Sequence, residues 1–330
     1  MARRAGVAIS TVSAVINRSA PVSDDVILRV QDAIREIGYV QHSAAKALRS
    51  GNSRLIGVIV PDITNPHFST VARVAEKVCM EAGYMTFVYN TGEDADQEMR
   101  ILQMMRMQRV AGLILISTRS DAAHGARLMS EINVPTVFLG SYVEEAPFDM
   151  ITLDEDRASH LAVDYLLGLG HRDVAVISGR AGVSTNEERL NACRRAFAEH
   201  GLELRDDRII PANFSQQQAY DGALALLAAK DRPTAIFALS NMMTIGVMRA
   251  LLSLKLSCPG DVSLIGIDDF EWPEIMNPPI SVVAQPIVAM TECAIRTLLD
   301  QITSKKDPVG HRTMFPPELI IRASCAPVGR

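Results

Sequence analysis

The sequence predicts an α/β protein in which a small helical segment precedes a large doubly wound body. The chain has 330 residues, enough for two or three domains. From residue 55 onward, short continuous apolar runs alternate with stretches of helical periodicity, as expected for a parallel sheet covered by helices. Residues 1–38 contain helical stretches divided by turns.

Charge is divided unevenly between these two parts. Residues 1–54 hold eight basic and four acidic side chains, a net charge of +4, which leaves −9 for the rest of a chain whose total is −5. A small basic segment on an acidic body suits binding to DNA by one end, because the phosphates attract that end and repel the body.

The stretch Gly6–Asn17 predicts the second helix of a helix-turn-helix. A glycine turn follows Arg3-Arg4-Ala5, the end of a first helical run, and opens into a short helix. Its inner face consists of Val12, Val15 and Ile16. Its outer face is small and polar and consists of Ser10, Thr11, Ser13 and Asn17. Such a face can reach phosphates and base edges of DNA, although this pattern alone also fits an ordinary surface helix.

A longer helix is predicted before Gly38. Ser23 suits its N-cap position, and Asp24 and Asp25 suit its first turn because carboxylates stabilise a helix N-terminus. Glycine at position 38 suits helix termination. The apolar stripe of this helix consists of Val26, Val30, Ala33, Ile34 and Ile37.

These motifs together resemble the DNA-binding headpiece of the lac repressor (LacI/GalR) family. Residues 5–17 read Ala-Gly-Val-x-x-x-Thr-Val-Ser-x-Val-x-Asn. Gly-Tyr and Ala-x-x-Leu follow at the distances at which that family has them. The resemblance continues along almost the whole chain. It implies a helix-turn-helix headpiece at residues 1–38, a hinge helix and linker at 39–54, and an effector-binding and dimerisation body at 55–330.

The resemblance also implies which residues contact operator DNA. They are Ile9, Ser10, Thr11, Ser13, Ala14, Asn17 and Arg18 in the headpiece, and Ala45 and Leu48 in the hinge. We expect residues 43–49 to become helical on an operator and Leu48 to wedge between bases in the minor groove.

Several departures from the family pattern weaken the expected contact with DNA. Ala8 replaces a capping serine, Ala14 replaces an arginine that often reads guanine, and Gln41-His42 replaces Pro-Asn. Relatives also carry several residues before Arg3, whereas only about one helical turn precedes the glycine turn here. We therefore expect residues 1–54 as given to bind operator poorly, and upstream residues from a longer reading frame to restore binding.

The body is predicted to alternate strands with helices. Strands are expected at Leu55–Val60, Met85–Tyr89, Gly112–Ile116, Thr136–Leu139, Met150–Leu153, Val174–Ser178, Ala235–Leu239 and Val262–Ile267. Helices are expected at about 66–82, 95–108, 121–132, 156–169, 185–200, 215–229 and 241–254. The first of these helices has Asn65 as a cap and Pro66 at the first helical position.

The resemblance implies a periplasmic-binding-protein-like body of two Rossmann-like subdomains. The chain should cross between them near 154–160, 280–286 and 312–320. The expected N-subdomain spans about 55–155 and 286–313, and the expected C-subdomain spans about 156–282 and 318–330. Ligands of open α/β sheets bind beyond the carboxyl ends of the strands. Two facing subdomains should therefore build one cleft that closes by a hinge motion.

The resemblance places effector-binding residues in the loops around this cleft. They are His67, Phe68, Arg157, Arg189, Phe214, Ser240, Asn241, Asp268, Trp272 and Gln285. Arg189 is expected to hold ligand oxygens through two parallel hydrogen bonds, and Asp268 to accept hydrogen bonds from ligand hydroxyls. Ser240-Asn241 departs from the Asn-Asp of relatives and lacks a carboxylate. The alternatives are core packing for Phe68 and a solvated helix position for Arg189.

Two further residues leave the nature of the effector open. Arg157 adds positive charge near the cleft and favours a sugar acid or a phosphorylated sugar over a neutral sugar, unless its side chain points into solvent. Trp272 is the only tryptophan, and it either stacks on the ligand or covers the rim of the cleft.

Catalysis has little support in the sequence. There is no Gly-x-Ser-x-Gly elbow, no His-Glu-x-x-His pair and no P-loop lysine, and Pro61-Asp62 stands where a dinucleotide fingerprint would follow the first strand. The histidines lack partners at metal-ligand spacing. We therefore expect no enzymatic activity, no cofactor and no metal.

The cellular compartment follows from the cysteines and the apolar runs. Five cysteines are scattered along the chain without a Cys-x-x-Cys pair, which indicates reduced thiols in the cytoplasm. No apolar run approaches the roughly 20 residues of a membrane span, and no secretory signal follows the N-terminal arginines.

The sequence therefore favours a cytoplasmic transcriptional regulator, a repressor that binds operator DNA and a small sugar, sugar acid or sugar phosphate. The alternative is a solute-binding protein for sugar uptake without DNA binding, which shares the body but lacks a headpiece. Operator half-sites lie on a two-fold axis, so a homodimer is expected. It should form through the helix after Asn65 and the helix that contains Ile245, Met248 and Leu252.

Overall fold

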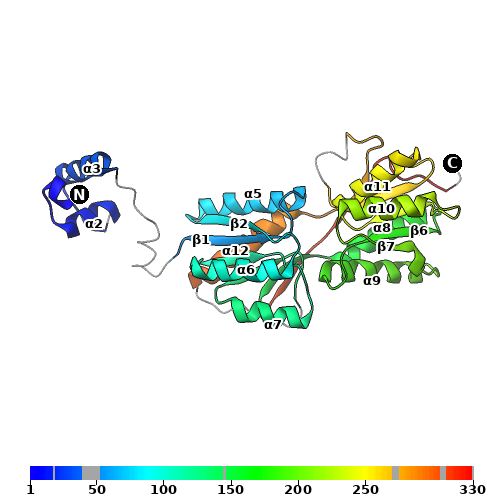
Figure 1. Ribbon diagram of the computed structural model, residues 1–330, viewed down its shortest axis with the longest axis horizontal. Coiled ribbons are helices and arrows are strands. Elements are labelled where there is room, and N and C mark those ends of the chain that lie inside the picture. The colour runs from blue at the N-terminus through cyan, green and yellow to red at the C-terminus, as the bar shows by residue number, and fades with distance from the viewer. Residues whose placement is uncertain (18, 39–52, 144–145, 270–274, 305–309, 329–330) are drawn as a thin grey trace. The chain divides into compact units, whose positions relative to one another are not determined.

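The computed structural model describes residues 1–17, 19–38, 53–143, 146–269, 275–304 and 310–328. The chain forms two compact units, Met1–Ser53 and Arg54–Arg330 (Figure 1). Within the described ranges, no helix combines the length and the apolar character needed to cross a membrane.

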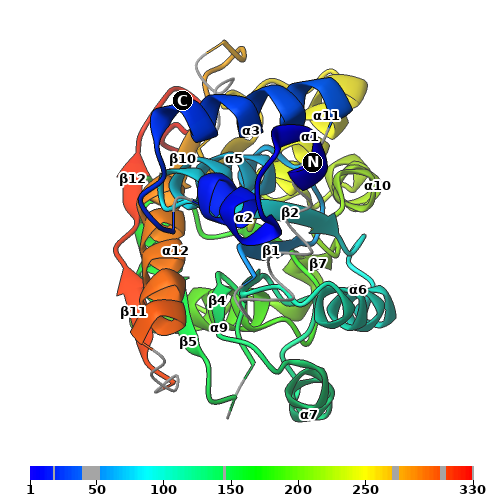
Figure 2. The same ribbon diagram turned by 90° about the vertical axis from the view of Figure 1, so that its left-hand side faces the viewer.

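The first unit consists of helices α1 (Ala2–Ala5), α2 (Ile9–Asn17) and α3 (Asp24–Ile37), drawn in blue in Figure 2. They enclose a small core of Ala5, Val12, Val30 and Ala33. Gly6 turns α1 into α2 with a φ of 63°, a left-handed conformation that suits glycine. Arg29 of α3 donates from Nε to the Ala5 carbonyl at 3.0 Å and from Nη2 to the Gly6 carbonyl at 3.1 Å, so it fixes this turn.

The ends of α3 lie where the sequence predicts them. Gly38 terminates the helix with a φ of 63°, as predicted. Ser23 occupies the N-cap position, as predicted, although its side chain makes no capping hydrogen bond. The carboxylates of Asp24 and Asp25 in the first turn still complement the helix dipole.

The second unit contains two six-stranded sheets, of which the first belongs to the N-subdomain. Its strand order is β11-β5-β4-β3-β1-β2, parallel throughout. The strands are β1 (Leu55–Val60), β2 (Met85–Asn90), β3 (Gly112–Leu115), β4 (Thr136–Leu139), β5 (Asp149–Leu153) and β11 (Arg312–Phe315). Helices α5 (Pro66–Glu81) and α12 (Ile287–Ser304) cover one face, and α6 (Ala95–Met107) and α7 (Ala122–Glu131) cover the other.

The second sheet belongs to the C-subdomain and has the order β12-β10-β9-β8-β6-β7, parallel except for β12. Its strands are β6 (Val174–Ser178), β7 (Ile209–Pro211), β8 (Ala235–Ala238), β9 (Ser263–Ile267), β10 (Ser281–Ala284) and β12 (Glu318–Ile320). Helices α8 (Glu155–Gly168) and α9 (Ser184–Glu199) pack together, as do α10 (Gln216–Ala228) and α11 (Asn241–Leu254). A short 3₁₀ helix, η1 (Asp206–Arg208), precedes β7.

The chain passes between the two sheets after β5, β10 and β11. All eight predicted strands are present, with ends that differ by at most one residue. Strands β7, β10, β11 and β12 and the helix α12 were not predicted. Strands β7, β11 and β12 lie at sheet edges and are only partly buried, so they lack a clear apolar run.

The imidazole of His171 joins three segments of the C-subdomain. Its Nδ1 lies 2.9 Å from Oγ1 of Thr234, and its Nε2 lies 3.1 Å from both Oγ of Ser263 and the carbonyl oxygen of Ala326. The side chain is only 3% exposed, and burial lowers the pKa of His171. The folded protein therefore holds this imidazole neutral.

We expect the stability of the protein to fall on acidification, in part through His171. The pKa of this residue is lower in the folded state than the value near 6.5 of an unfolded chain, so the unfolded state binds more protons and stability is lost as the pH drops below about 6.5. A His171→Gln variant should lose about 2 °C less in melting temperature than wild type between pH 7.5 and 5.5. His311 is exposed, and a His311→Gln control should behave as wild type. Equal losses in all three proteins would contradict this assignment.

Candidate functional site

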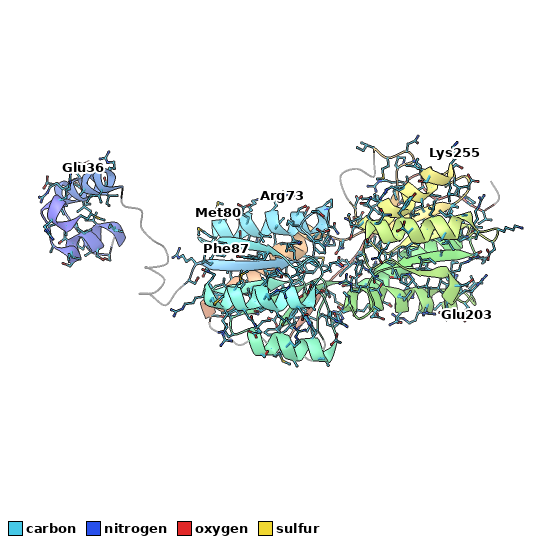
Figure 3. The ribbon with its side chains drawn as sticks, in the orientation of Figure 1. Glu36, Arg73, Met80, Phe87, Glu203 and Lys255 are labelled. Carbon is cyan, nitrogen blue, oxygen red and sulfur yellow. The ribbon has the colours of Figure 1, made fainter. Side chains whose placement is uncertain are left out.

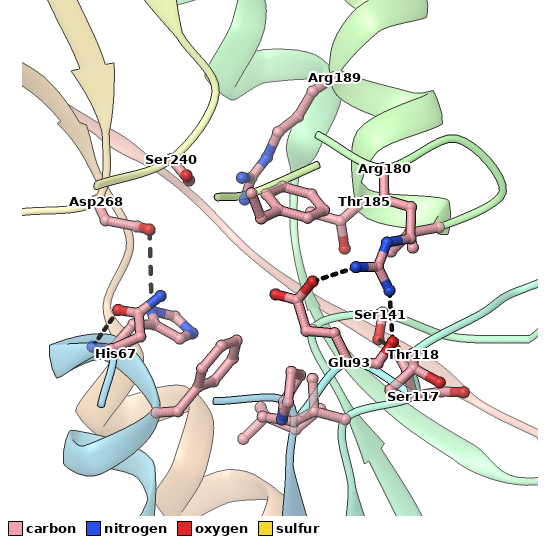
Figure 4. A pocket seen from close by; sticks show the side chains of 18 of the residues that line it. His67, Glu93, Ser117, Thr118, Ser141, Arg180, Thr185, Arg189, Ser240 and Asp268 are labelled. Atoms are coloured by element: carbon pink, nitrogen blue, oxygen red, sulfur yellow. Dashed lines mark hydrogen bonds and ion pairs between the residues drawn. The ribbon is translucent and has the colours of Figure 1, made fainter. Parts of the chain in front are cut away.

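A cavity of about 110 Å³ lies between the two subdomains, at the carboxyl ends of their strands (Figure 4). Side chains from both subdomains converge on it. Seven of the predicted effector residues line this cavity: His67, Phe68, Arg189, Phe214, Ser240, Asp268 and Gln285. The cavity lies where the strand-end rule predicts it, namely the rule that ligands of open α/β sheets bind beyond the carboxyl ends of the strands.

Asp268 is the centre of a polar cluster in the cavity wall. It follows β9 with a φ of 77° and is 7% exposed. Its Oδ1 accepts a hydrogen bond from Nε2 of Gln285 and lies 3.8 Å from Nδ1 of His67. Burial lowers the pKa of His67, and the nearby Asp268 opposes this shift only in part. The cluster therefore combines one carboxylate with a neutral imidazole and an amide, groups that bind hydroxyls well.

Arg189 forms a buried ion pair that the sequence did not suggest. Its Nε donates to Oε2 of Glu155 at 2.6 Å, and its Nη2 donates to Oε1 at 3.0 Å. Its Nη1 donates to the carbonyl of Leu239 at 2.7 Å. The expectation that this guanidinium offers its two-pronged edge to a ligand is therefore wrong for this structure, because Glu155 occupies that edge.

The pKa values of this pair reflect both burial and attraction. Burial raises the pKa of Glu155, and the charge of Arg189 opposes the shift. Burial disfavours the charge of Arg189 as well, but the carboxylates of Glu155, Asp268 and Glu188 together outweigh burial and raise the pKa of the guanidinium. Both carboxylate oxygens accept hydrogen bonds, so Glu155 is ionised within the pair.

Phe214 forms an aromatic wall of the cavity. It adopts a φ of 61°, which is unusual for a bulky residue, and its ring lies directly against Gly179. A side chain at position 179 would overlap that ring. Glycine after β6 therefore allows the aromatic wall to approach the strand end.

Several hydrogen-bonded contacts join the subdomains around the cavity, and two of them involve side chains that line it. Arg180, after β6, donates from Nη2 to Oε2 of Glu93 at 2.6 Å and from Nη1 to the Glu93 carbonyl at 2.5 Å. Asn241 donates from Nδ2 to Oδ1 of Asn65 at 2.7 Å. Figure 4 shows the Arg180–Glu93 pair at the edge of the cavity.

The sequence analysis missed several polar residues that line the cavity. They are Glu93, Ser117, Thr118, Ser141, Glu155, Arg180 and Thr185. Most of them directly follow strands β2, β3, β4, β5 and β6. The strand-end rule would have found them if every loop had been included, rather than only the loops that carry family motifs.

Two of the described predicted effector residues, Arg157 and Asn241, do not line the cavity. Arg157 is exposed on α8, and only its backbone N–H is engaged, with Asp154 at 3.0 Å. This placement removes the reason to favour an anionic effector. Asn241 is buried in its contact with Asn65. Trp272 lies outside the described residues.

The structure places the predicted DNA-contacting residues of α2 on two sides. Ile9 is 80% exposed, and Ser10 and Ser13 are exposed as well. Thr11 and Ala14 are half-buried. Asn17 is the last residue of α2. Arg18, Ala45 and Leu48 lie outside the described residues.

We expect Gly179→Ala to destabilise the protein by about 1–3 kcal/mol, because the added methyl group overlaps the ring of Phe214 and one of them must move. Gly168 offers a matched control, since it ends α8 with no atom near the position of an added Cβ. Gly168→Ala should be neutral or slightly stabilising. Urea unfolding measures both effects, and equal stability of the two variants would show that Phe214 moves without cost.

Two family models match this chain. Residues 1–41 match the bacterial regulatory proteins of the lacI family, and residues 163–325 match a periplasmic binding protein-like domain. The chain is 32% identical over 303 residues to the ribose operon repressor of Escherichia coli (strain K12). The matched region covers 92% of this chain and 92% of that repressor.

Solved structures share the fold. The lac repressor dimer bound to operator and the anti-inducer ONPF matches with a TM-score of 0.87 at 23% identity, over 98% of this chain and 97% of that chain. A LacI family transcriptional regulator from Enterococcus faecium with bound ribose matches with a TM-score of 0.73 at 28% identity, over 83% of this chain and 99% of that chain.

Proposed function

We infer the function of this chain from the family to which it belongs, the lacI family of bacterial regulatory proteins. The chain is a DNA-binding transcriptional repressor whose affinity for its operator is switched by a small sugar-like effector in the cleft between the subdomains. It acts as a dimer, in the cytoplasm. The exposed polar side of α2 reads the operator, with Ser10 and Ser13 among its contacts.

The size of the cavity carries the proposal for the effector. A volume of about 110 Å³ holds roughly ten groups the size of a water molecule, at about 10–15 Å³ each. A monosaccharide has about that many non-hydrogen atoms, whereas a disaccharide is far larger. The aromatic rings of Phe68 and Phe214 and the polar cluster at Asp268 suit the two faces and the hydroxyls of one sugar ring.

The charges around the cavity favour an uncharged sugar. The guanidinium groups of Arg180 and Arg189 are paired with Glu93 and Glu155, and Asp268 adds one more carboxylate to the wall. We therefore propose a neutral monosaccharide, in place of the sugar acid or sugar phosphate that Arg157 had favoured. The ribose in the name of the Escherichia coli relative and in the Enterococcus faecium structure belongs to this class.

A solute-binding protein without DNA binding is the other function that fits the body. The match of residues 1–41 to the regulatory family disfavours it, because a transport protein has no use for a helix-turn-helix. Binding of the full chain to DNA separates the two functions.

We expect a neutral monosaccharide to raise the melting temperature of the full-length protein. A ligand at 100 times its Kd stabilises by about 2.7 kcal/mol. The panel contains D-ribose, other pentoses, hexoses, aldonates, sugar phosphates and purine bases. The sugar that binds should also change the affinity for an operator selected from random DNA, measured by fluorescence anisotropy. A protein that binds a sugar but no DNA, even with upstream residues of the reading frame restored, would support the transport alternative.

Asp268→Asn should weaken binding of that sugar by about 10- to 100-fold, because a charged hydrogen-bond acceptor is lost from the cavity wall. Asp269 provides a neighbouring control: it pairs with Arg322 at 3.0 Å and does not line the cavity. Asp269→Asn should leave the Kd unchanged in isothermal titration calorimetry. Equal effects of the two substitutions would argue against the proposed role of Asp268.

We expect the dimer to form through α5 and α11. Figure 3 shows Arg73 and Met80 projecting from α5, and Met80 is 66% exposed and Leu252 of α11 is 71% exposed. Leu252→Glu should give the mass of a single chain by light scattering at micromolar concentration. Met129 on α7 is 45% exposed, and Met129→Glu should keep the mass of a dimer. A dimer of the Leu252 variant would place the interface elsewhere.

A further inference from the structure

The ion pair between Glu155 and Arg189 determines what the cavity can bind. Glu155 lies in the first turn of α8, immediately after β5, and Arg189 lies on α9. Their side chains are 4% and 5% exposed, and both residues line the cavity. The pair is therefore a part of the binding wall and is not screened by solvent as a surface ion pair is.

Glu155 uses one of the two edges through which a guanidinium can bind an anion with two parallel hydrogen bonds. Carboxylates and phosphates bind arginine through two parallel N–H donors, and here Nε and Nη2 already donate to the two oxygens of Glu155. With Nη1 bound to the Leu239 carbonyl, one N–H on Nη1 and one on Nη2 have no partner among these three bonds. Each can donate to a single hydroxyl oxygen, which is what a neutral sugar offers.

An anionic ligand would also meet uncompensated negative charge. Asp268 is close enough to interact electrostatically with both members of the pair. A ligand carboxylate beside Arg189 would then be the third negative group around one guanidinium, next to side chains that are only 4% and 5% exposed. Like charges at such distances repel strongly when they are buried.

We propose that Glu155 is the residue that selects the charge of the effector: by occupying Arg189 it admits neutral sugars and rejects their carboxylate and phosphate derivatives. This inference rests on the proposed function of the cavity and adds a residue that controls its specificity. Without the carboxylate of Glu155, Arg189 would be a buried cation with a free anion-binding edge.

The first test compares matched ligands by isothermal titration calorimetry. The pairs are D-ribose with D-ribonate and D-glucose with D-glucuronate, each tested on the full-length protein. Wild type should prefer the neutral member of the pair that it binds. Glu155→Gln should lower the ratio of neutral to anionic affinity by about tenfold or more, because it frees the guanidinium and removes the repelling charge.

Glu93→Gln is the matched control. It removes the same charge from the same cavity, but its partner is Arg180, and the side chains of that pair are 25% and 34% exposed. The ratio should change by less than about threefold in this variant because solvent screens the released charge. A wild type that binds ribonate as tightly as ribose, an unchanged ratio in the Glu155 variant, or an equal change in both variants would each overturn the proposal.

A second test does not need a sugar and remains informative if the Glu155→Gln protein is unstable. Glu155→Ala leaves space for a small carboxylate beside Arg189. Sodium formate should raise the melting temperature of this variant by about 3 °C more than sodium chloride of the same ionic strength, and it should not do so for wild type. Equal effects of formate and chloride would overturn the proposal.

The two tests separate this inference from the proposed function. If no neutral sugar binds wild type, the proposed effector class is wrong. The formate result still decides whether Glu155 prevents anions from binding to Arg189. If a neutral sugar binds and the Glu155 variants behave as wild type, the proposed effector class is supported. The proposal that Glu155 selects neutral over anionic effectors is then wrong.

Discussion

The carboxyl ends of two parallel sheets meet at one gap in this chain, and the composition of the cleft follows from that constraint. Parallel strands all emerge at the same edge of a sheet, so every strand-to-helix loop delivers its first residues to that edge. Glu93 after β2, Glu155 after β5, Arg180 after β6 and Asp268 after β9 reach the cavity in this way. Residues separated by more than a hundred positions thereby line one cavity.

Several contacts between the two subdomains are polar, as expected if the body opens and closes. Arg312 of β11 donates from both terminal nitrogens to Glu188 of α9 at 2.8 Å, and the hydroxyl of Tyr142 donates to the same carboxylate at 2.8 Å. These side chains and the Arg180–Glu93 pair are only partly buried. Partly exposed ion pairs contribute little net stability. Separation of the subdomains therefore costs far less than unfolding either sheet, and hinge motion is the expected response to a ligand.

The sequence predicted the strands well because both sheets are covered on both faces. A strand such as β6 or β9 is buried at every residue, so its apolar run is uninterrupted and its ends are sharp. Short strands at sheet edges lack this signal. The side-chain pairings were less predictable, because the partner of Arg189 lies 34 positions away and no local pattern connects the two.

The region around β5 and α8 shows why a correct loop can still give the wrong residue. The sequence pointed to this crossing and to Arg157, whereas Glu155 is the residue that lines the cavity. Residues two positions apart on a helix point in very different directions, so Glu155 faces the gap and Arg157 faces solvent. Which of these two side chains faces the cavity depends on where α8 begins, and helix boundaries are the least certain part of an argument from periodicity.

The proposed dimer face and the cleft share two helix N-termini, and we infer from this that effector binding and assembly are coupled. Helix α5 begins after its cap Asn65, whose Oδ1 accepts from the His67 backbone N–H at 3.0 Å and also from Asn241, the first residue of α11. The exposed residues of the proposed dimer face, Met80 and Leu252, lie farther along these same two helices. If the dimer forms through these helices, a ligand that changes the spacing of the subdomains at the cleft would shift α5 against α11. The self-complementary face of a two-fold dimer would then have to repack or rotate, which we propose as the route from a sugar in the cleft to the affinity for an operator.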